Sequence, residues 1–158
     1  MSPMYDMNNI RVYTDLNLGI MLHRDVAGIT TGQNPIYTIF TGPVLVRALY
    51  GVVTVQLQAA ALLIHLDFNA DSGAGQDFDL CVDSADLTGT AVGTVLIPPA
   101  TVAGAITTDG GGGLNICPSW VMMPGTLDLH ANNTRTGTIL WTMFYVPLIE
   151  GAYVTAHA

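Results

Sequence analysis

The sequence predicts an all-β protein that folds as a single β-sandwich, jelly-roll-like in its strand arrangement. Val, Ile, Thr, Leu and Gly are abundant in the chain of 158 residues. Turn-forming residues interrupt them roughly every 8 to 12 residues, a spacing typical of short strands in a sandwich or barrel. Neither a long helical period nor an internal repeat accompanies this pattern. We therefore expect roughly eight to ten strands over residues 17–158, preceded by an extended N-terminal arm over residues 1–16.

Two short strands are expected near the start of the domain, over residues 18–25 and 37–40. The segment between them is rich in residues that favour turns, which predicts a loop. The residues that carry this prediction are Gly28, Gly32, Asn34 and Pro35.

The strongest β segment covers residues 44–58. Its second half alternates apolar with polar side chains, as a strand with one buried face does. The apolar residues are Val53, Val55 and Leu57, and the polar ones are Thr54, Gln56 and Gln58. Gly51 predicts a bend or bulge before this half, which would let one long strand serve two parts of a sheet.

The middle of the chain is predicted to hold three strands, over residues 61–68, 78–82 and 92–97. Asn, Asp, Ser and Gly residues over 69–75 and over 83–89 mark the turns between them. Residues 98 and 99 are both proline and end the third strand. Residues 100–105 can be a short helix or an irregular loop, and the glycine run at 110–113 is expected to be a flexible link.

The C-terminal part is predicted to begin with two short strands, over residues 114–117 and 120–123. A strand over 126–130 follows, in which apolar and polar residues alternate. Residues 132–137 are expected to form a hairpin loop. The run 138–146 predicts a buried closing strand, and residues 151–155 a short last one.

The charge content is unusually low. The chain contains no lysine and one glutamate, Glu150, and 10% of its residues are charged, against about 25% in a typical soluble domain. A free monomer normally covers its surface with long charged side chains, so we expect neighbouring subunits to cover part of this one. The net charge of -8 predicts no nucleic-acid partner, because phosphate binding requires basic patches.

No membrane partner is expected either. The longest strongly apolar stretch, residues 59–64, is far shorter than the roughly 18 to 20 residues of a membrane-spanning helix. The N-terminus lacks the basic start and apolar core of a secretory signal, which predicts synthesis in the cytosol.

The residues that could support catalysis form no known catalytic signature, so we expect neither an enzyme nor a cofactor. No nucleophile elbow or catalytic triad pattern is present. The four histidines, His23, His65, His130 and His157, stand apart, with neither HxH nor HExxH spacing. A metal site assembled from them by the fold is the alternative.

The aspartate-rich stretch after residue 66 is the best sequence candidate for a metal site. Asp67, Asn69 and Asp71 occupy alternating positions, as the ligands of a calcium loop do. However, Ser72 stands where such a loop needs glycine, and no glutamate closes the site. An ordinary turn explains the same residues, because Asp, Asn, Ser and Gly bond the local backbone. A turn without metal is therefore the expectation, and calcium the alternative.

The two cysteines each lie in an apolar setting: Cys81 between Leu80 and Val82, and Cys117 between Ile116 and Pro118. Buried free thiols behave as small apolar groups, and this is the expectation for both. A disulfide between them is the alternative, and it requires adjacent strands.

The arm carries many apolar and aromatic side chains and few charges. Such side chains bury large areas adaptably and are common at interfaces. They either pack on the arm's own sandwich or grasp a neighbouring subunit. The predicted interface residues are Met4, Tyr5, Met7, Ile10, Val12 and Tyr13.

Three stretches of the chain resemble a group of small β-rich virion proteins of tailed bacteriophages. They are RALYGVVT at 47–54, DLCV at 79–82, and PGTLDL at 124–129 leading to ILWTMFYVPL at 139–148. The resemblance covers about residues 44–150 and implies a head-decoration (cement) protein, with no catalytic residues. The partners it implies are sister copies, most simply in a homotrimer, and the major capsid protein. The implied location is the capsid surface, after synthesis in the host cytoplasm.

A second function remains open on the sequence. A receptor- or glycan-binding β-module of a phage tail or fibre would have a similar composition. Such a module needs exposed aromatic side chains beside Asp or Asn, and Trp120 and Trp141 are the candidates for this role.

Overall fold

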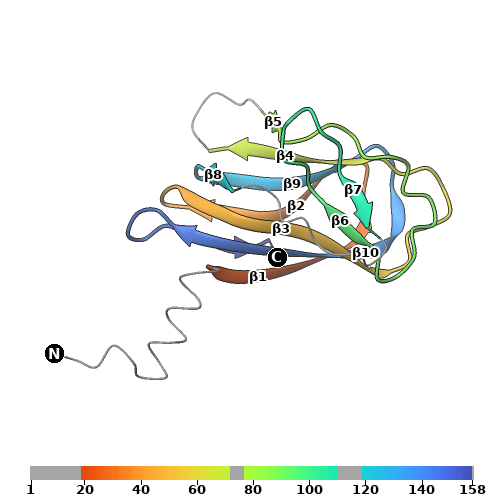
Figure 1. Cartoon of the computed structure of the whole chain (residues 1–158), viewed down its shortest axis with the longest axis horizontal. Coiled ribbons are helices and arrows are strands. Elements are labelled where there is room, and N and C mark those ends of the chain that lie inside the picture. The colour runs from red at the N-terminus through yellow and green to blue at the C-terminus, as the bar shows by residue number, and fades with distance from the viewer. Residues whose placement is uncertain (1–18, 72–76, 110–118, 158) are drawn as a thin grey trace, which may run out of the picture.

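The computed structural model describes residues 19–71, 77–109 and 119–157 (Figure 1). Within these ranges the chain forms eleven strands and no helix. The strands are β1 (Ile20–Ile29), β2 (Gly32–Phe40), β3 (Val44–Val55), β4 (Ile64–Ala70), β5 (Asp77–Asp79), β6 (Val95–Ile97), β7 (Thr107–Asp109), β8 (Trp120–Met122), β9 (Gly125–Ala131), β10 (Arg135–Pro147) and β11 (Tyr153–Ala156). The predicted all-β class is confirmed. No helix in the described ranges is long and apolar enough to cross a membrane.

The strands form two sheets whose pairings are all antiparallel. Sheet A has the order β1-β10-β3-β6-β7, and β8 also pairs with β3. Sheet B has the order β11-β2-β9-β4-β5. Strands that follow one another in the chain mostly lie in different sheets, so the connections cross repeatedly between the two layers (Figure 1).

The core lies between the two sheets and is built from the inward-facing residues of both. Trp141 of β10 and Tyr37 of β2 are the largest side chains that are completely buried. The hydroxyl of Tyr37 donates a hydrogen bond of 2.8 Å to the carbonyl oxygen of Trp141, so it joins sheet B to sheet A. The hydroxyl of Tyr145 on β10 accepts a second such bond, 3.2 Å long, from the main-chain nitrogen of Val154 on β11.

The long strand β3 serves two neighbours along one edge, as the sequence predicts. Its first residues pair with β8 and its later ones, Gly51 and Val52, with β6. The pairing of β3 with β10 shifts register on either side of Gly51 rather than at it. Gly51 is needed for a different reason: a Cβ there would lie 2.9 Å from Cγ2 of Ile139 and 3.3 Å from Cε2 of Trp141.

The prediction of a long loop between the first two strands is wrong. β1 ends at Ile29 and β2 begins at Gly32, so Asn34 and Pro35 lie inside a strand. The side-chain amide of Asn34 donates to the carbonyl oxygens of Thr30, Gly32 and Leu129, while its oxygen accepts from Thr30. Pro35 lies at a register shift in the pairing of β2 with β9. A strand tolerates proline at such a bulge.

Other boundaries differ from the predictions in a few places. β4 continues to Ala70, so the turn starts after residue 70 rather than at 69. Residues 100–105 form an irregular turn, in which Ala105 makes an isolated bridge to Val82. β7 is a strand that the sequence did not predict. The arm over 1–16, the strand predicted over 114–117 and the glycine run 110–113 lie outside the described residues.

Candidate functional site

One end of the sandwich is rich in exposed apolar side chains. The β2–β3, β8–β9 and β10–β11 connections all cross between the sheets at this end, and β1 begins there, at the left of Figure 1. Eight of the thirteen large apolar side chains that are exposed in the described ranges belong to it. We call these residues the apolar end: Ile20, Met21, Phe40, Val121, Met123, Leu148, Ile149 and Tyr153.

Five of the eight residues of the apolar end belong to strands. Ile20 pairs with Tyr145 across β1 and β10, and the rings of Phe40 and Tyr153 stack with their centroids 5.1 Å apart. Val121 lies on β8 opposite Leu45 and is 63% exposed. Contiguous exposed apolar surface usually marks an interaction site. The apolar end is therefore a candidate surface for contact with another protein.

The predicted interface residues of the arm, from Met4 to Tyr13, lie outside the described residues. The described chain starts at Gly19, immediately before β1, and the first two residues of β1, Ile20 and Met21, belong to the apolar end. Of the two tryptophans proposed for glycan contact, Trp141 is completely buried, and Trp120 is partly buried and packs against the core.

A second candidate site lies on the outward face of sheet B, where β4 and β9 run side by side. The register places His65 opposite His130 and Asp67 opposite Asp128. The two imidazole rings stack, with centroids 4.5 Å apart and planes inclined by 24°. Inward-facing neighbours such as Leu66 and Leu129 belong to the core, so these four polar residues share the other face.

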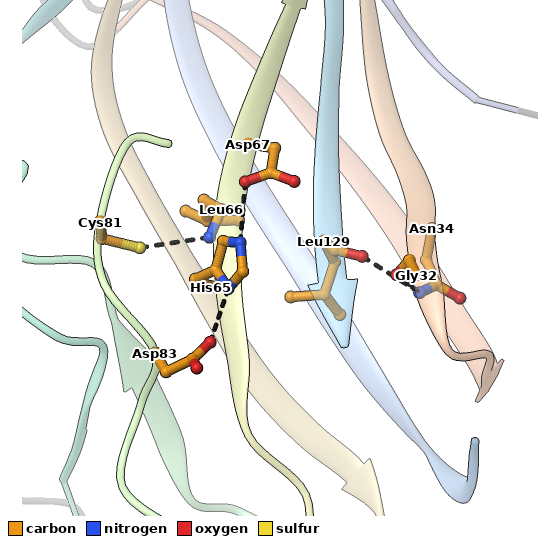
Figure 2. Close-up of polar contacts among 8 residues, drawn as sticks. All are labelled: Gly32, Asn34, His65, Leu66, Asp67, Cys81, Asp83 and Leu129. Atoms are coloured by element: carbon orange, nitrogen blue, oxygen red, sulfur yellow. Dashed lines mark hydrogen bonds and ion pairs between the residues drawn. The ribbon is translucent and has the colours of Figure 1, made fainter. Parts of the chain in front are cut away.

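The segment after β5 contacts the ring of His65. Residues 80–84 run beside β4, since Leu80 and Ser84 donate main-chain hydrogen bonds to the carbonyls of Leu66 and Ile64. This brings Oδ1 of Asp83 to 2.7 Å from Nδ1 of His65. Figure 2 shows the ring of His65 between Asp83 and Asp67, with its Nε2 3.0 Å from Oδ1 of Asp67.

Asp67 is an acidic side chain on the outward face and yet only 3% exposed. Burial raises the pKa of its carboxyl, and the neighbouring Asp79 raises it further, while His65 and His130 act in the opposite direction. Within the described ranges its Oδ1 is buried and makes no hydrogen bond of acceptable geometry. A buried carboxylate oxygen of this kind is costly unless a cation or a proton compensates it.

The structure places the predicted metal residues differently from a calcium loop. Asp67 and Asn69 lie within β4, and Asp71 follows the strand and is exposed. Within the described part of the chain, the fold brings together potential ligand atoms of His65, Asp67 and His130, which lie within 4.8 Å of one another. His23 lies apart on β1 in sheet A, where its Nδ1 is 3.0 Å from the hydroxyl of Thr142.

The sequence contains a signal for this cluster that the search for HxH and HExxH motifs missed. His65 and Asp67 are separated by one residue, as are Asp128 and His130. On a strand, residues two apart share a face. Antiparallel strands run in opposite directions. A strand with the sequence HxD can therefore place its histidine opposite the histidine, and its aspartate opposite the aspartate, of a strand with the sequence DxH.

Cys81 is a free, buried cysteine, as expected. Its Sγ accepts a hydrogen bond of 3.2 Å from the main-chain nitrogen of Leu66 (Figure 2). Burial raises the pKa of this thiol to about 11. Cys117 lies outside the described residues.

Comparison of the chain with models of known protein families, with curated proteins and with solved structures finds no match. The resemblance to phage virion proteins therefore stays a prediction.

Proposed function

We propose that this chain is a structural subunit of a virus particle, in which sister copies associate through the apolar end. The most specific form of the proposal is a decoration (cement) protein of a tailed-bacteriophage head. In this form a homo-oligomer, most simply a trimer, sits on the major capsid protein at the capsid surface. The observation that carries the proposal is the concentration of exposed apolar side chains at the end of the sandwich where β1 begins.

The sequence before Gly19 supports sister copies as the occupants of the apolar end. Eighteen residues precede Gly19, and they include the apolar and aromatic anchors Met4, Tyr5 and Tyr13. An extended segment of about this length spans several tens of ångströms, enough to reach a neighbouring subunit. Closed symmetric rings are the common outcome when identical chains associate.

The composition supports the same conclusion. Lysine and glutamate are depleted in interfaces relative to the rest of a protein surface, and this chain has no lysine and a single glutamate. A surface with so few long charged side chains is suited to being covered by other subunits.

The strand order supports a jelly-roll arrangement for the sandwich. Four strands of sheet A, β1-β10-β3-β6, face four strands of sheet B, β2-β9-β4-β5. Successive strands mostly alternate between the sheets, which supports the two interlocked Greek keys of a jelly roll, a fold common among viral capsid proteins. The fold alone assigns no function, so this point is secondary to the apolar end.

The proposed function is energetic rather than chemical. A subunit that binds across the junctions of an assembled shell adds buried apolar area in the assembled state only. Each Å² of apolar surface contributes about 25 cal/mol, less the costs of association. Repetition over many copies makes the total large, so the shell resists pressure from packaged nucleic acid.

Cryo-electron microscopy of purified particles that contain this chain tests the proposal. We expect density for the sandwich at regularly repeated positions on the head, with the apolar end against a sister copy. Density at the tail alone would overturn the cement function in favour of the receptor- or glycan-binding module. The exposed stacked pair of Phe40 and Tyr153 would then be the surface to examine for sugar contacts.

A further inference from the structure

The outward face of sheet B carries a row of carboxylates across three strands. Asp67 on β4 is paired with Asp79 on β5 on one side and with Asp128 on β9 on the other. Directly opposed residues share a face, with their Cβ atoms about 4.5–5.5 Å apart, and like charges placed in this way destabilise a sheet. A positive charge near Asp67 would relieve this repulsion.

The ring of His65 is oriented toward this row. Its Nδ1 lies 2.7 Å from Oδ1 of Asp83, and its Nε2 lies 3.0 Å from Oδ1 of Asp67. A neutral imidazole has one N–H group. When that group donates to Asp83, Nε2 is unprotonated and lies 3.0 Å from a buried carboxylate oxygen of Asp67 that lacks a hydrogen bond in the described ranges. Two acceptor atoms in this position can share a cation.

His130 supplies a third donor. Its ring stacks on that of His65, and its potential ligand atom lies within 4.8 Å of those of His65 and Asp67. Two imidazoles and one carboxylate form a ligand set typical of zinc and of related transition metals, whereas calcium and magnesium prefer oxygen ligands alone.

We infer that His65, Asp67 and His130 bind one divalent transition-metal ion, with Zn²⁺ as the best fit to the donor set. Asp83 would act as the outer partner that orients His65, as carboxylates commonly do for metal-bound histidines. This inference is independent of the proposed structural function, because it concerns a different surface of the sandwich.

The spacing of the donors requires the side chains to move closer together. Zinc lies about 2.0–2.2 Å from nitrogen and oxygen ligands, so the ligand atoms of a tetrahedral site lie about 3.3–3.6 Å apart. The three atoms here lie within 4.8 Å of one another, so rotation of the half-buried imidazoles has to bring the more distant atoms about 1 Å closer. Three protein ligands leave a fourth position for water. The bound ion would tie β4 to β9 on the face away from the core.

Calorimetric titration of the full chain, stripped of metal with a chelator, tests the inference with ZnCl₂ as the probe. We expect one Zn²⁺ bound per chain and a melting temperature that rises by several degrees with Zn²⁺, since a ligand of the native state stabilises it. CaCl₂ is expected to give neither effect. Co²⁺ should produce visible absorption bands whose intensity reports a four- or five-coordinate site.

Four variants locate the site. His65→Gln and His130→Gln should each weaken Zn²⁺ binding by tenfold or more, and Asp83→Asn by about 10- to 100-fold through loss of the outer partner. His23→Gln is the matched control, because it removes an imidazole from a strand of the other sheet, and should bind as the wild type does. Melting of each variant without metal checks that it folds.

Two results would overturn the inference. One is the absence of Zn²⁺ binding by the folded wild-type chain, which would mean that a proton alone bridges Asp67 and His65. The other is unchanged binding by His130→Gln. Neither result changes the oligomeric mass of the chain, so failure of the metal site and failure of the proposed function remain distinguishable.

Discussion

The hydroxyl of Tyr37 in sheet B donates a hydrogen bond to the carbonyl oxygen of Trp141 in sheet A, 2.8 Å away and fully buried. The same hydroxyl lies 3.2 Å from the carbonyl oxygen of Leu22 on β1. A single side chain therefore connects three strands across the core. Burial also raises the pKa of Tyr37 well above its ordinary value, so the hydroxyl keeps its proton and remains a donor.

Tyr37→Phe is expected to lower the free energy of unfolding by about 1 kcal/mol, the net contribution of a typical buried hydrogen bond. Tyr153→Phe is the matched control, because the side chain of Tyr153 is 46% exposed, and should change stability by less than about 0.5 kcal/mol. Urea unfolding of both variants checks the difference. Equal effects of the two substitutions would contradict the role assigned to Tyr37.

Tyr145→Phe is expected to cost more than Tyr37→Phe, about 1 to 3 kcal/mol. The hydroxyl of Tyr145 is the acceptor for the main-chain nitrogen of Val154, and its loss leaves a buried donor unpaired. The same unfolding experiment measures this. Stability equal to that of the wild type would show that β11 is held to the sandwich by other contacts.

Asn34→Asp tests the turn between β1 and β2. The amide nitrogen of Asn34 donates to three carbonyl oxygens, at 2.8 to 3.0 Å. A carboxylate of the same shape would face these oxygens with no proton to donate, so we expect a loss of about 2 to 3 kcal/mol. Asn133→Asp is the control, because Asn133 makes a single exposed contact of 3.3 Å to Ala61. A stable Asn34→Asp protein at neutral pH would contradict this account.

Gly51→Ala tests the close packing of β3 on β10. The added methyl group would lie 2.9 Å from Ile139 and 3.3 Å from Trp141, which are both completely buried. Overpacking of this kind costs about 1 to 3 kcal/mol. Thr54→Ala, at an exposed position of the same strand, should have little effect. Thermal unfolding compares the two, and equal melting temperatures would show that the neighbouring side chains can move aside.

The raised pKa of Cys81 predicts a pH dependence. The thiol titrates near pH 9 in the unfolded chain and near 11 in the folded one, because burial disfavours the thiolate. The folded state therefore holds this proton more tightly. The resulting stability is fully present below about pH 9 and is lost as the pH rises toward 11.

The measurement for Cys81 uses Cys117→Ser as the background, so that a single thiol remains. The stability difference between this protein and its Cys81→Ala derivative should shrink as the pH rises from 9 to 11. A thiol reagent at pH 8 should label folded Cys81 far more slowly than unfolded Cys81, because the thiolate is the reactive form. Rapid labelling of the folded protein would contradict the buried position.

The sequence predicted best those strands whose residues show a periodic pattern of apolar and polar side chains. The apolar run at 138–146 became part of β10, because a buried strand has a recognisable pattern. The alternation after Gly51 was only partly confirmed, because β3 ends at Val55 and the side chain of Val55 is 54% exposed. Asn34 and Pro35 misled the prediction, since residues that favour turns also occur at bulges. The hydrogen bond from Asn34 to Leu129, and the position of both residues opposite β9, depend on a strand far away in the sequence.

The candidate metal cluster was not predictable as a site for the same reason. His65 and His130 lie 65 residues apart, and only the register of β4 against β9 makes them neighbours. A shift of one residue in that register would separate them. The sequence did indicate Asp67 as a metal candidate, but it grouped Asp67 with the residues that follow it along the chain rather than with those beside it in the sheet.

The apolar end is the central element of the proposed function, and the mass of the protein in solution tests it most directly. Light scattering on the full chain should give a multiple of 16.7 kDa, about threefold for a trimer. Val121→Asp, in the apolar end, should shift the mass toward that of one chain, because a charge in the centre of an interface is strongly unfavourable. Val92→Asp should leave the oligomer intact, since Val92 is equally exposed, at 62% against 63%, but lies outside the apolar end. A wild-type mass of one chain at all concentrations, or an equal response of the two variants, would contradict the account.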